Sequence, residues 1–302
     1  IHAYANATIS GNTFNHFRNN PIIIDYADGA RVTDNTISGD AAGNEGFFTD
    51  GVSFYASIFS VVSGNTISGF TSAVRFFYAS GISVSENELT ANTNGLELDN
   101  VSTEYGPVSV SGNIITGNTE AGVYIRESLG IEFSDNEVSM NAQRGFFIQQ
   151  AGEINIANNQ VNHNGSGEED HGGILVNDGS GFISVTSNSI SQNNGFGMVI
   201  DASFANALVD NEINTNMGAG LILLNGAQWN QVLTNTMRKN AIGVISGLEG
   251  NLLFPGNNLF QGNTLVNNQL VDALDYDPVC NDAWVANNIG SSASVSAACI
   301  EP

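Results

Sequence analysis

The stretch GVYIRESLGIEFSDN at residues 122–136 is followed by GFFIQQAGEINIANN at residues 145–159, which repeats the same pattern. Each stretch holds two short runs in which apolar and polar residues alternate, and each ends on an asparagine. Alternation with a period of two is typical of a β-strand that buries one face. Because Gly, Asn, Ser and Asp separate the runs, we expect short strands joined by turns and no long helices.

A unit of 22 to 30 residues recurs along almost the whole chain, and asparagine marks its register. Each marker stands in the frame apolar-x-x-Asn-x-apolar, and in most units a second asparagine follows five residues later. The first set is Asn12, Asn35, Asn65, Asn87, Asn113, Asn136, Asn159, Asn188, Asn211, Asn235 and Asn263. The second set is Asn92, Asn118, Asn141, Asn164, Asn193, Asn216, Asn240 and Asn268. Such a repeat indicates a solenoid in which each unit forms one turn.

Strands this short cannot bury an apolar face alone, so each is expected to pair with the equivalent strand of the next turn. The apolar residue after each marker asparagine then joins an internal column, as Ile115, Val138 and Val161 would. The asparagines stack at one corner, where their amides can donate and accept along the stack and tolerate a sharp turn. The fold class is therefore all-β: one β-solenoid domain of about eleven coils, ~50 Å long at roughly 4.8 Å per strand.

Composition limits the partners of this rod. The 302 residues include 30 acidic and 7 basic residues, which gives a net charge of −23. Nucleic acid and anionic membranes are poor partners for such a surface, and no run is apolar enough for membrane insertion. The charge is typical of a soluble secreted protein and leaves a cationic partner open. Because the chain starts at Ile1 in mid-repeat, we expect an upstream segment that was removed or is absent.

The end of the chain departs from the repeat. Residues 1–270 carry the repeated units, and residues 271–302 form a capping tail of the same domain. Cys280 and Cys299 are an isolated pair in this tail, which favours a disulfide over a metal site. We expect the disulfide to close a C-terminal cap over the open end of the coil, where sheet edges are exposed. Disulfide use indicates an extracellular or cell-surface location.

Units such as VSGNIITGN at residues 110–118 resemble the PbH1 repeats of the NosD-like group, within the right-handed parallel β-helix superfamily of pectate lyases, polygalacturonases and alginate epimerases. The resemblance extends over nearly the whole chain and implies a single-stranded right-handed coil. It leaves function open, because lyases, hydrolases, epimerases, adhesins and phage spikes share these repeats. The paired aspartates of polygalacturonases and the full epimerase motif are missing. The resemblance does not imply copper binding, because clusters of soft ligands are missing as well.

Four insertions interrupt the even spacing of the units: one lies between Asn235 and Asn263, and the other three border one strand. Residues 39–51 and 165–173 both follow the second asparagine position and precede the next strand, so both should leave the rod at the same corner. Residues 101–107 lie at the other end of that strand, between the first two insertions. Function usually sits where a regular solenoid is interrupted. We therefore expect the three loops to wall a groove along one face.

The strand beside these loops carries the candidate site. Four successive turns place charged and tyrosine side chains on its outward face: Tyr55, Arg75, Tyr78, Glu97, Asp99, Tyr124, Arg126 and Glu127. Arginine binds carboxylates bidentately, tyrosine faces stack on sugar rings, and a phenol or carboxylate can move a proton. The plainer interpretation is that these residues form cross-strand ion pairs on a solvated sheet.

The leading hypothesis is a secreted protein that binds an acidic polysaccharide and, as an enzyme, acts as a lyase or a uronate C5-epimerase. Arg126 or Arg75 would neutralise the uronate carboxylate, and Tyr124 or Asp99 would move the proton. The substrate-binding candidates are Tyr55, Arg75, Tyr78, Glu97 and Glu127. No cofactor is required, although Ca²⁺ is a candidate because one acidic segment offers hard oxygen ligands. Those ligands are Glu168, Glu169, Asp170 and Asp178, and a charged solvated loop also explains them.

An outward apolar row on the same strand supports a rival hypothesis. The row consists of Phe147, Leu175, Val199, Ile222 and Ile245. An apolar stripe over five turns is unusual on a monomer, so the tail after Leu270, a missing segment or another subunit should cover it. If another subunit covers it, the protein is a structural or adhesive rod that self-associates into a trimer or fibre.

Overall fold

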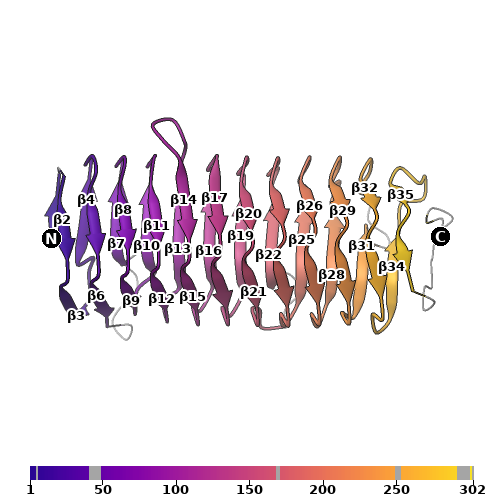
Figure 1. Cartoon of the computed structure of the whole chain (residues 1–302), viewed down its shortest axis with the longest axis horizontal. Helices are drawn as coiled ribbons and strands as arrows, with labels where there is room; N and C mark the ends of the chain where they lie inside the picture. The colour runs from indigo at the N-terminus through magenta and orange to yellow at the C-terminus, as the bar shows by residue number, and fades with distance from the viewer. Residues whose placement is uncertain (5, 41–48, 168–170, 249–252, 291–299, 301–302) are drawn as a thin grey trace.

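The computed structural model describes residues 1–302 except 5, 41–48, 168–170, 249–252, 291–299 and 301–302. Figure 1 shows a single rod of stacked turns with the two termini at opposite ends. The described residues form three parallel sheets of twelve strands each, and none of them is helical. The predicted β-solenoid is confirmed. In this part of the chain no helix has the length and apolar character needed to cross a membrane.

Each turn contributes one strand to each sheet, here named A, B and C in chain order. Sheet A contains β1 (His2–Ala3), β4 (Ile22–Asp25), β7 (Asp50–Tyr55), β10 (Ser72–Phe77), β13 (Asn94–Asp99), β16 (Ala121–Arg126), β19 (Arg144–Gln149), β22 (Gly172–Asn177), β25 (Phe196–Asp201), β28 (Ala219–Leu224), β31 (Ile242–Ser246) and β34 (Val271–Asp275). Sheet B contains β2 (Thr8–Ser10), β5 (Arg31–Thr33), β8 (Val61–Ser63), β11 (Ser83–Ser85), β14 (Val108–Ser111), β17 (Ile131–Ser134), β20 (Asn155–Ala157), β23 (Ser184–Thr186), β26 (Ala207–Val209), β29 (Gln231–Leu233), β32 (Leu259–Gln261) and β35 (Ala283–Val285). Sheet C contains β3 (Thr13–Phe17), β6 (Thr36–Gly39), β9 (Thr66–Ser68), β12 (Glu88–Thr90), β15 (Ile114–Thr116), β18 (Glu137–Ser139), β21 (Gln160–Asn162), β24 (Ser189–Ser191), β27 (Glu212–Asn214), β30 (Thr236–Arg238), β33 (Thr264–Val266) and β36 (Asn288–Ile289).

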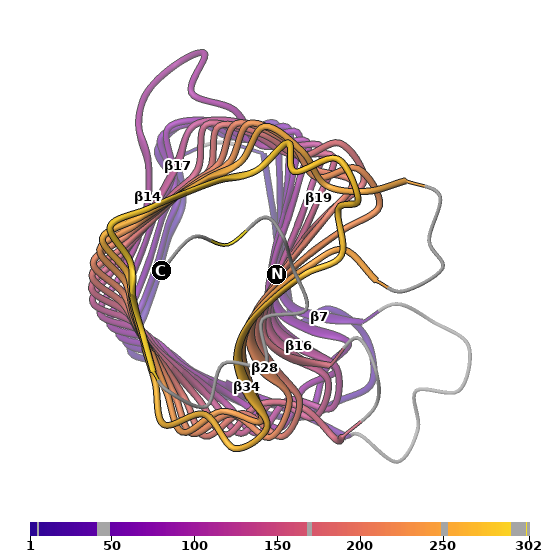
Figure 2. The same ribbon diagram turned by 90° about the vertical axis from the view of Figure 1, so that its right-hand side faces the viewer.

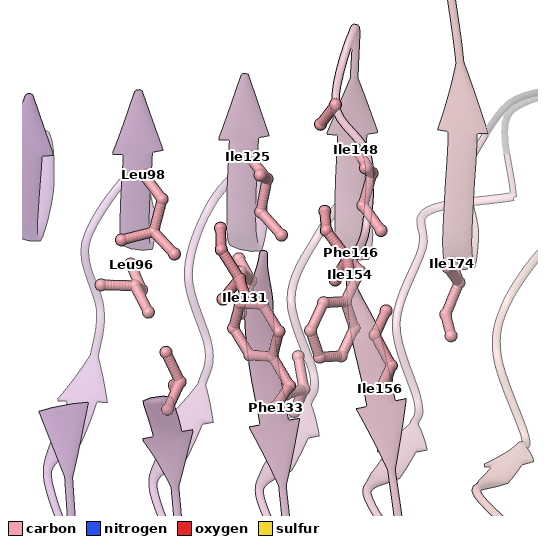
Figure 3. Close-up of a cluster of buried hydrophobic side chains, with 14 of the residues drawn as sticks. Leu96, Leu98, Ile125, Ile131, Phe133, Phe146, Ile148, Ile154, Ile156 and Ile174 are labelled. Carbon is pink, nitrogen blue, oxygen red and sulfur yellow. The ribbon is translucent and has the colours of Figure 1, made fainter. Parts of the chain in front are cut away.

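Apolar columns fill the inside of the coil, because equivalent strands pair in register. Leu96 of β13 lies between Val74 and Val123 of the neighbouring turns, and all three side chains are fully buried. Figure 3 shows part of this core, where Phe133 of sheet B and Phe146 of sheet A meet edge to face. The core is therefore continuous along the rod, as the stacking of short strands requires.

The marker asparagines form the predicted ladder. The side-chain amide of Asn113 donates to Asn136 Oδ1 at 2.9 Å and to the Val84 carbonyl at 3.0 Å, and the Asn113 backbone N–H donates to the same Oδ1 at 3.0 Å. The second asparagines stack likewise at the corner between sheets C and A. Each buried amide is satisfied, so the corners carry no unpaired polar cost.

A third ladder at the corner between sheets A and B was missed by the sequence analysis. Asn206 donates to Asn230, and Asn230 to Asn258, each at 2.9 Å. In all three ladders the asparagine side-chain amides donate toward the C-terminus, and each ladder has its own last acceptor. The three last acceptors are Asp282, Asp272 and Asn287.

The predicted tail contains a further turn of the coil. β34, β35 and β36 pair in parallel with β31, β32 and β33 of the preceding turn. The domain boundary at residue 270 stays a prediction. The predicted disulfide cap cannot be placed, because Cys299 lies outside the described residues.

The insertions leave the rod at two corners, as Figure 2 shows in end view. Residues 39–51 connect β6 to β7, and residues 165–173 connect β21 to β22, so both lie at the predicted C-to-A corner. Residues 101–107 project beside β14 and β17, on the side away from β7, β16 and β28 of sheet A. There the Tyr105 N–H donates to Ser80 Oγ at 2.9 Å. The expectation that this loop walls the outer face of sheet A was wrong, because its backbone folds over the A-to-B corner.

Candidate functional site

The structure brings the predicted site residues together on the outer face of sheet A. Parallel register places Arg75, Glu97 and Tyr124 in one row across β10, β13 and β16. A second row places Asp99 beside Arg126, and the strand ends beyond it carry the residues that continue outward. These end residues are Tyr78, Asn100 and Glu127, all with positive φ.

Asp99 and Arg126 form the central ion pair of the face. Arg126 Nε lies 3.3 Å from Asp99 Oδ1, and its Nη2 contacts Asp99 Oδ2, so the contact is bidentate. Asp99 is 1% exposed, whereas Arg126 remains accessible from solvent. The hydrogen bond to Asp99 raises the pKa of Arg126. A carboxylate held in this way positions the guanidinium and is poorly placed to exchange protons with a substrate.

Arg75 extends this pair into a network. Its Nε lies 3.4 Å from Glu97 Oε1, and its Nη2 lies 3.9 Å from Asp99 Oδ2. Ser72 Oγ donates to the other oxygen of Glu97 at 2.6 Å. The two arginines therefore face two carboxylates within the sheet, and neither guanidinium is an uncompensated positive charge. This is the cross-strand pairing that the plainer interpretation of the sequence predicts.

Asp50 joins the same face and was missed by the sequence analysis. It is the first residue of β7 and pairs with Ser72, at the end of the first insertion. Its side chain is buried, and Oδ1 has no hydrogen-bond partner in the described structure. Burial raises the pKa of Asp50 to about 6, opposed by Arg75 and reinforced by Glu97. The signal in the sequence is the Asp-Gly step that opens the strand, which we assigned to the loop.

A ring contact and two successive hydrogen bonds hold Tyr124 in place. Its ring stacks on Phe147 with centroids 5.1 Å apart, and its hydroxyl donates to Gln149 Oε1 at 3.3 Å. The Gln149 amide in turn donates to Asp178. Burial raises the pKa of Tyr124, against the opposing effect of Arg126. The phenol is therefore neutral near pH 7 and can donate a proton, but it is a poor base.

Four aromatic residues form what we call the aromatic shelf, at the end of sheet A beside the ion pairs: Tyr26, Tyr55, Phe77 and Tyr78. Tyr55 lies 5.2 Å from Tyr26 and 5.6 Å from Phe77 between ring centroids, and Phe77 lies 4.2 Å from Tyr78. Arg75 Cζ lies 5.7 Å from the Phe77 ring centroid, so the shelf adjoins the network. Tyr26 and Tyr78 are 65% and 52% exposed, which leaves ring faces available to a ligand. The sequence analysis predicted Tyr55 and Tyr78 as ligand contacts, which stays a prediction, and did not include Tyr26 and Phe77.

The outward apolar row lies where it was predicted, but it is not an exposed stripe. Leu175, Val199, Ile222 and Ile245 are only 3–8% exposed. Phe196, Leu224, Ile242, Leu274 and Tyr276 pack against the cluster formed by Ala219, Ile222 and Ile245. Phe147, at the other end of the row, is covered by Tyr124 and by Arg144, whose Cζ lies 4.6 Å from its ring centroid. Leu274 and Tyr276 lie after Leu270, so the tail supplies part of the cover that the sequence predicts for this row.

Of the four predicted Ca²⁺ ligands, only Asp178 lies among the described residues. Glu168, Glu169 and Asp170 lie outside the described residues, and the Asp178 carboxylate accepts a hydrogen bond from Gln149. Within the described residues, no three His, Cys, Asp or Glu side chains are placed to hold a metal ion. His2 and His163 contact Asp25 and Asn162 in different parts of the rod, so the histidines do not converge.

Comparison with known families agrees with the architecture. The model of the family described as "Periplasmic copper-binding protein (NosD)" matches residues 5–171, and that of "Right handed beta helix region" matches residues 108–237. The first match covers more than half of the chain, so the chain belongs to the NosD family of right-handed parallel β-helix proteins. The described residues do not fit the copper ion of that description, because they lack a convergent set of ligands.

Several solved structures share the fold. The A-module of the mannuronan C-5 epimerase AlgE6 from Azotobacter vinelandii is 15% identical with a TM-score of 0.73, and the match covers 96% of this chain and 83% of that one. A double mutant of the periplasmic alginate epimerase AlgG is 15% identical with a TM-score of 0.67, covering 89% and 70%. DFA-IIIase from Arthrobacter chlorophenolicus A6 is 12% identical with a TM-score of 0.58, covering 85% and 68%. No curated protein matches the chain in sequence. At these identities the likeness establishes the fold alone.

Proposed function

We propose that this protein works outside the cytoplasm and binds a polysaccharide on the outer face of sheet A, where the aromatic shelf adjoins the Arg–carboxylate network. The observation that carries the proposal is the group of clustered, solvent-accessible rings beside side chains that can form hydrogen bonds. Sugar rings present apolar faces and hydroxyl edges, so such sites pair aromatic surfaces with polar groups. The glycan-acting names of the structural neighbours and the periplasmic descriptions of the NosD family and AlgG support this proposal.

The charge of the face favours a neutral glycan over the acidic polysaccharide expected from the sequence. Arg75 and Arg126 are matched by Glu97 and Asp99, and Asp50 lies beside them. A uronate would have to compete with the buried Asp99 for Arg126 and would approach a protein with a net charge of −23. Hydroxyl groups of a neutral glycan can accept from the remaining guanidinium N–H groups without displacing a carboxylate.

Binding to a defined panel of polymers tests the proposal. Alginate, polygalacturonate, β-glucan and inulin are compared by affinity electrophoresis and calorimetry, using the whole chain and the variants Tyr55→Ala and Tyr78→Ala. We expect binding to β-glucan or inulin that is roughly tenfold weaker in each variant, the scale of one lost stacking contact. Met140→Ala is the control, since Met140 is 60% exposed and lies at the C-to-A corner, away from the shelf.

Two results would contradict the proposal. Binding that survives in both shelf variants would show that the shelf is not the site. Binding of alginate or polygalacturonate alone, lost in Arg75→Ala and Arg126→Ala, would restore the acidic ligand of the original hypothesis.

A second candidate function is catalysis on the bound glycan, favoured by a phenol with a raised pKa on this face. Tyr124 can donate a proton to the leaving oxygen, whereas Asp50 lies on β7, three strand pairings away, and cannot act on the same bond. Arg126 would stabilise the negative charge that develops on the leaving oxygen, and Asp99 would act by positioning Arg126. On a neutral glycan the attacking water would complete hydrolysis and release its proton to solvent, whereas elimination or epimerisation requires a uronate.

Product analysis separates catalysis from binding. Each polymer is incubated with the protein and assayed for new reducing ends, for unsaturated uronates and for C5 inversion by NMR. We expect Tyr124→Phe to abolish any product while leaving binding intact, since the ring remains. Wild-type protein that forms no product from a polymer that it binds would reject catalysis and leave binding in place.

A further inference from the structure

Bulky aromatic residues with positive φ gather at one corner of the rod. Every corner passes through left-handed backbone, which is costly for bulky side chains and least costly for glycine. In the described part of the chain, each Phe, Tyr or Trp with positive φ lies at the A-to-B corner: Tyr26, Phe59, Tyr78, Phe182 and Trp229, with φ between 51° and 57°. The B-to-C corner uses residues such as Gly64 and Asp135 at this conformation, and the C-to-A corner uses residues such as Gly117 and Met140.

Glycine occupies the same position in other turns, so the fold does not require aromatic rings there. The N–H groups of Phe182 and Trp229 donate to the carbonyls of Phe204 and Gly256 in the next turn. The N–H of Gly130 makes the equivalent bond to Gly152. Phe182 and Trp229 are nevertheless 63% and 56% exposed, so burial in the core does not offset the conformational cost.

We call Phe182, Phe204 and Trp229 the distal platform. The Phe182 and Phe204 ring centroids lie 5.7 Å apart at an interplanar angle of 84°. Gly181 leaves room for the Phe204 ring, since a Cβ at that position would lie 2.9 Å from it. Ala205 occupies the turn between Phe182 and Trp229, so these two rings are two strand spacings apart, roughly 10 Å. That spacing is about the length of a disaccharide in an extended chain.

We propose that the distal platform is a second glycan-binding site, specific for neutral sugar rings. It shares the ligand class of the proposed function and uses none of the same residues. The chain has no lysine or arginine between Arg144 and Arg238, so the platform lacks the cations that nucleic acid and acidic glycans require. Glu153, Ala205 and Asn257 interrupt the row of rings. This breaks up the contiguous apolar patch of ~800 Å² that a stable protein partner buries on each side.

The position of the platform allows one chain to contact both sites. β11 follows Tyr78 of the shelf and β23 follows Phe182, and four strand pairings separate them along sheet B. At ~4.8 Å per pairing, the sites are on the order of 20 Å apart along the rod. A polysaccharide longer than that span can bind both, so its second contact is intramolecular and its avidity rises.

Tryptophan fluorescence reads the platform directly, because the chain has only two tryptophans. Trp229 is exposed, whereas Trp284 is 8% exposed and stacks on Phe260 at 4.0 Å. We expect saturating β-glucan or inulin to shift the emission of Trp229 to the blue, and alginate and polygalacturonate to leave it unchanged. Trp229→Phe, which keeps only Trp284, should show no shift with any polymer. The absence of a shift with all four polymers in the wild-type protein would overturn the proposal.

Affinity variants separate this proposal from the proposed function. Phe182→Ala should weaken binding of long β-glucan or inulin about tenfold, the scale of one stacking contact. Met217→Ala is the control, because Met217 is 71% exposed at the C-to-A corner. Loss in Tyr55→Ala but not in Phe182→Ala would reject the platform and keep the shelf. Loss in Phe182→Ala alone would reject the shelf, and equal loss in Met217→Ala would attribute the effect to general apolar surface.

Discussion

The two halves of the outer face of sheet A have the same backbone and opposite surfaces. Between β7 and β16 the outward positions hold Arg75, Glu97 and Asp99 in an ion-pair network beside exposed tyrosines. Between β22 and β31 the same positions hold Val199 and Ile222, which neighbouring side chains cover. Inward apolar residues and two asparagine ladders run through both halves, and the third ladder begins at Asn206 in the second half. The inward residues therefore determine the coil, and the outward rows can differ, with polar residues in one half and packed apolar residues in the other.

The two halves should differ most in how their free energy of unfolding responds to one aspartate introduced into the outward row of each. Ile222→Asp would bury an unpaired carboxylate, so we expect a loss of roughly 3–4 kcal/mol in the free energy of unfolding. Ser53→Asp occupies the same row in the polar half and should change stability by less than about 1 kcal/mol. Urea unfolding followed by circular dichroism measures both. Equal losses would show that the polar half is as tightly packed as the apolar half.

The pH dependence of stability tests Asp50 in the polar half. Its folded pKa of about 6 lies above the ordinary aspartate value of 3.8, so the protonated form favours folding. Its stabilising effect is complete below pH 4 and is lost as pH rises through 6, a change on the order of 2–3 kcal/mol. Asp50→Asn should therefore flatten the stability profile between pH 4 and 7, as urea unfolding would reveal. The exposed Asp28→Asn is the control, and a profile unchanged in Asp50→Asn would refute the assignment.

Removing the centre of the network should have a smaller effect. Asp99→Asn keeps the shape and one acceptor but removes the charge that pairs with Arg126, so we expect a loss of about 1–2 kcal/mol at low salt. The loss should shrink when Arg126→Met is combined with it, because the unpaired guanidinium is then absent. Additive losses in this double-mutant cycle would mean that the pair is not coupled.

The exposed rings should have the smallest effect on stability. Tyr26→Ala and Tyr78→Ala are expected to change the free energy of unfolding by less than about 0.5 kcal/mol, since both rings face solvent. Thermal melts of the variants, compared with their glycan affinity, separate binding from folding. Large destabilisation would show that the shelf is part of the scaffold.

The repeated sequence pattern predicted the coil and its asparagine ladder. The burial of outward residues depends on contacts between turns, which the pattern does not show. The frame around Asn136 and Val138 recurs in sequence, so the ladder and its column could be predicted from it. Asn206 has no such frame, because Ser203 stands where the frame has an apolar residue, and its ladder was missed. The position of Ile222 on the outer face follows from strand alternation, but its burial depends on side chains such as Tyr276 that are distant in sequence. Asp50 was missed because the strand begins directly at the end of an insertion.

The three ladders give the rod a direction as well as a shape. Each amide donates toward the C-terminus, so a further turn can be inserted in the middle without changing any donor or acceptor role. Asp282 and Asp272 accept the last bonds of two ladders, and a carboxyl group lacks the amide N–H groups that carry the ladder forward. Two of the three ladders therefore end at these aspartates, whereas the last acceptor of the remaining ladder is Asn287. Such a protein can change its length by gaining or losing internal turns, while extension past the aspartates requires these residues to change first.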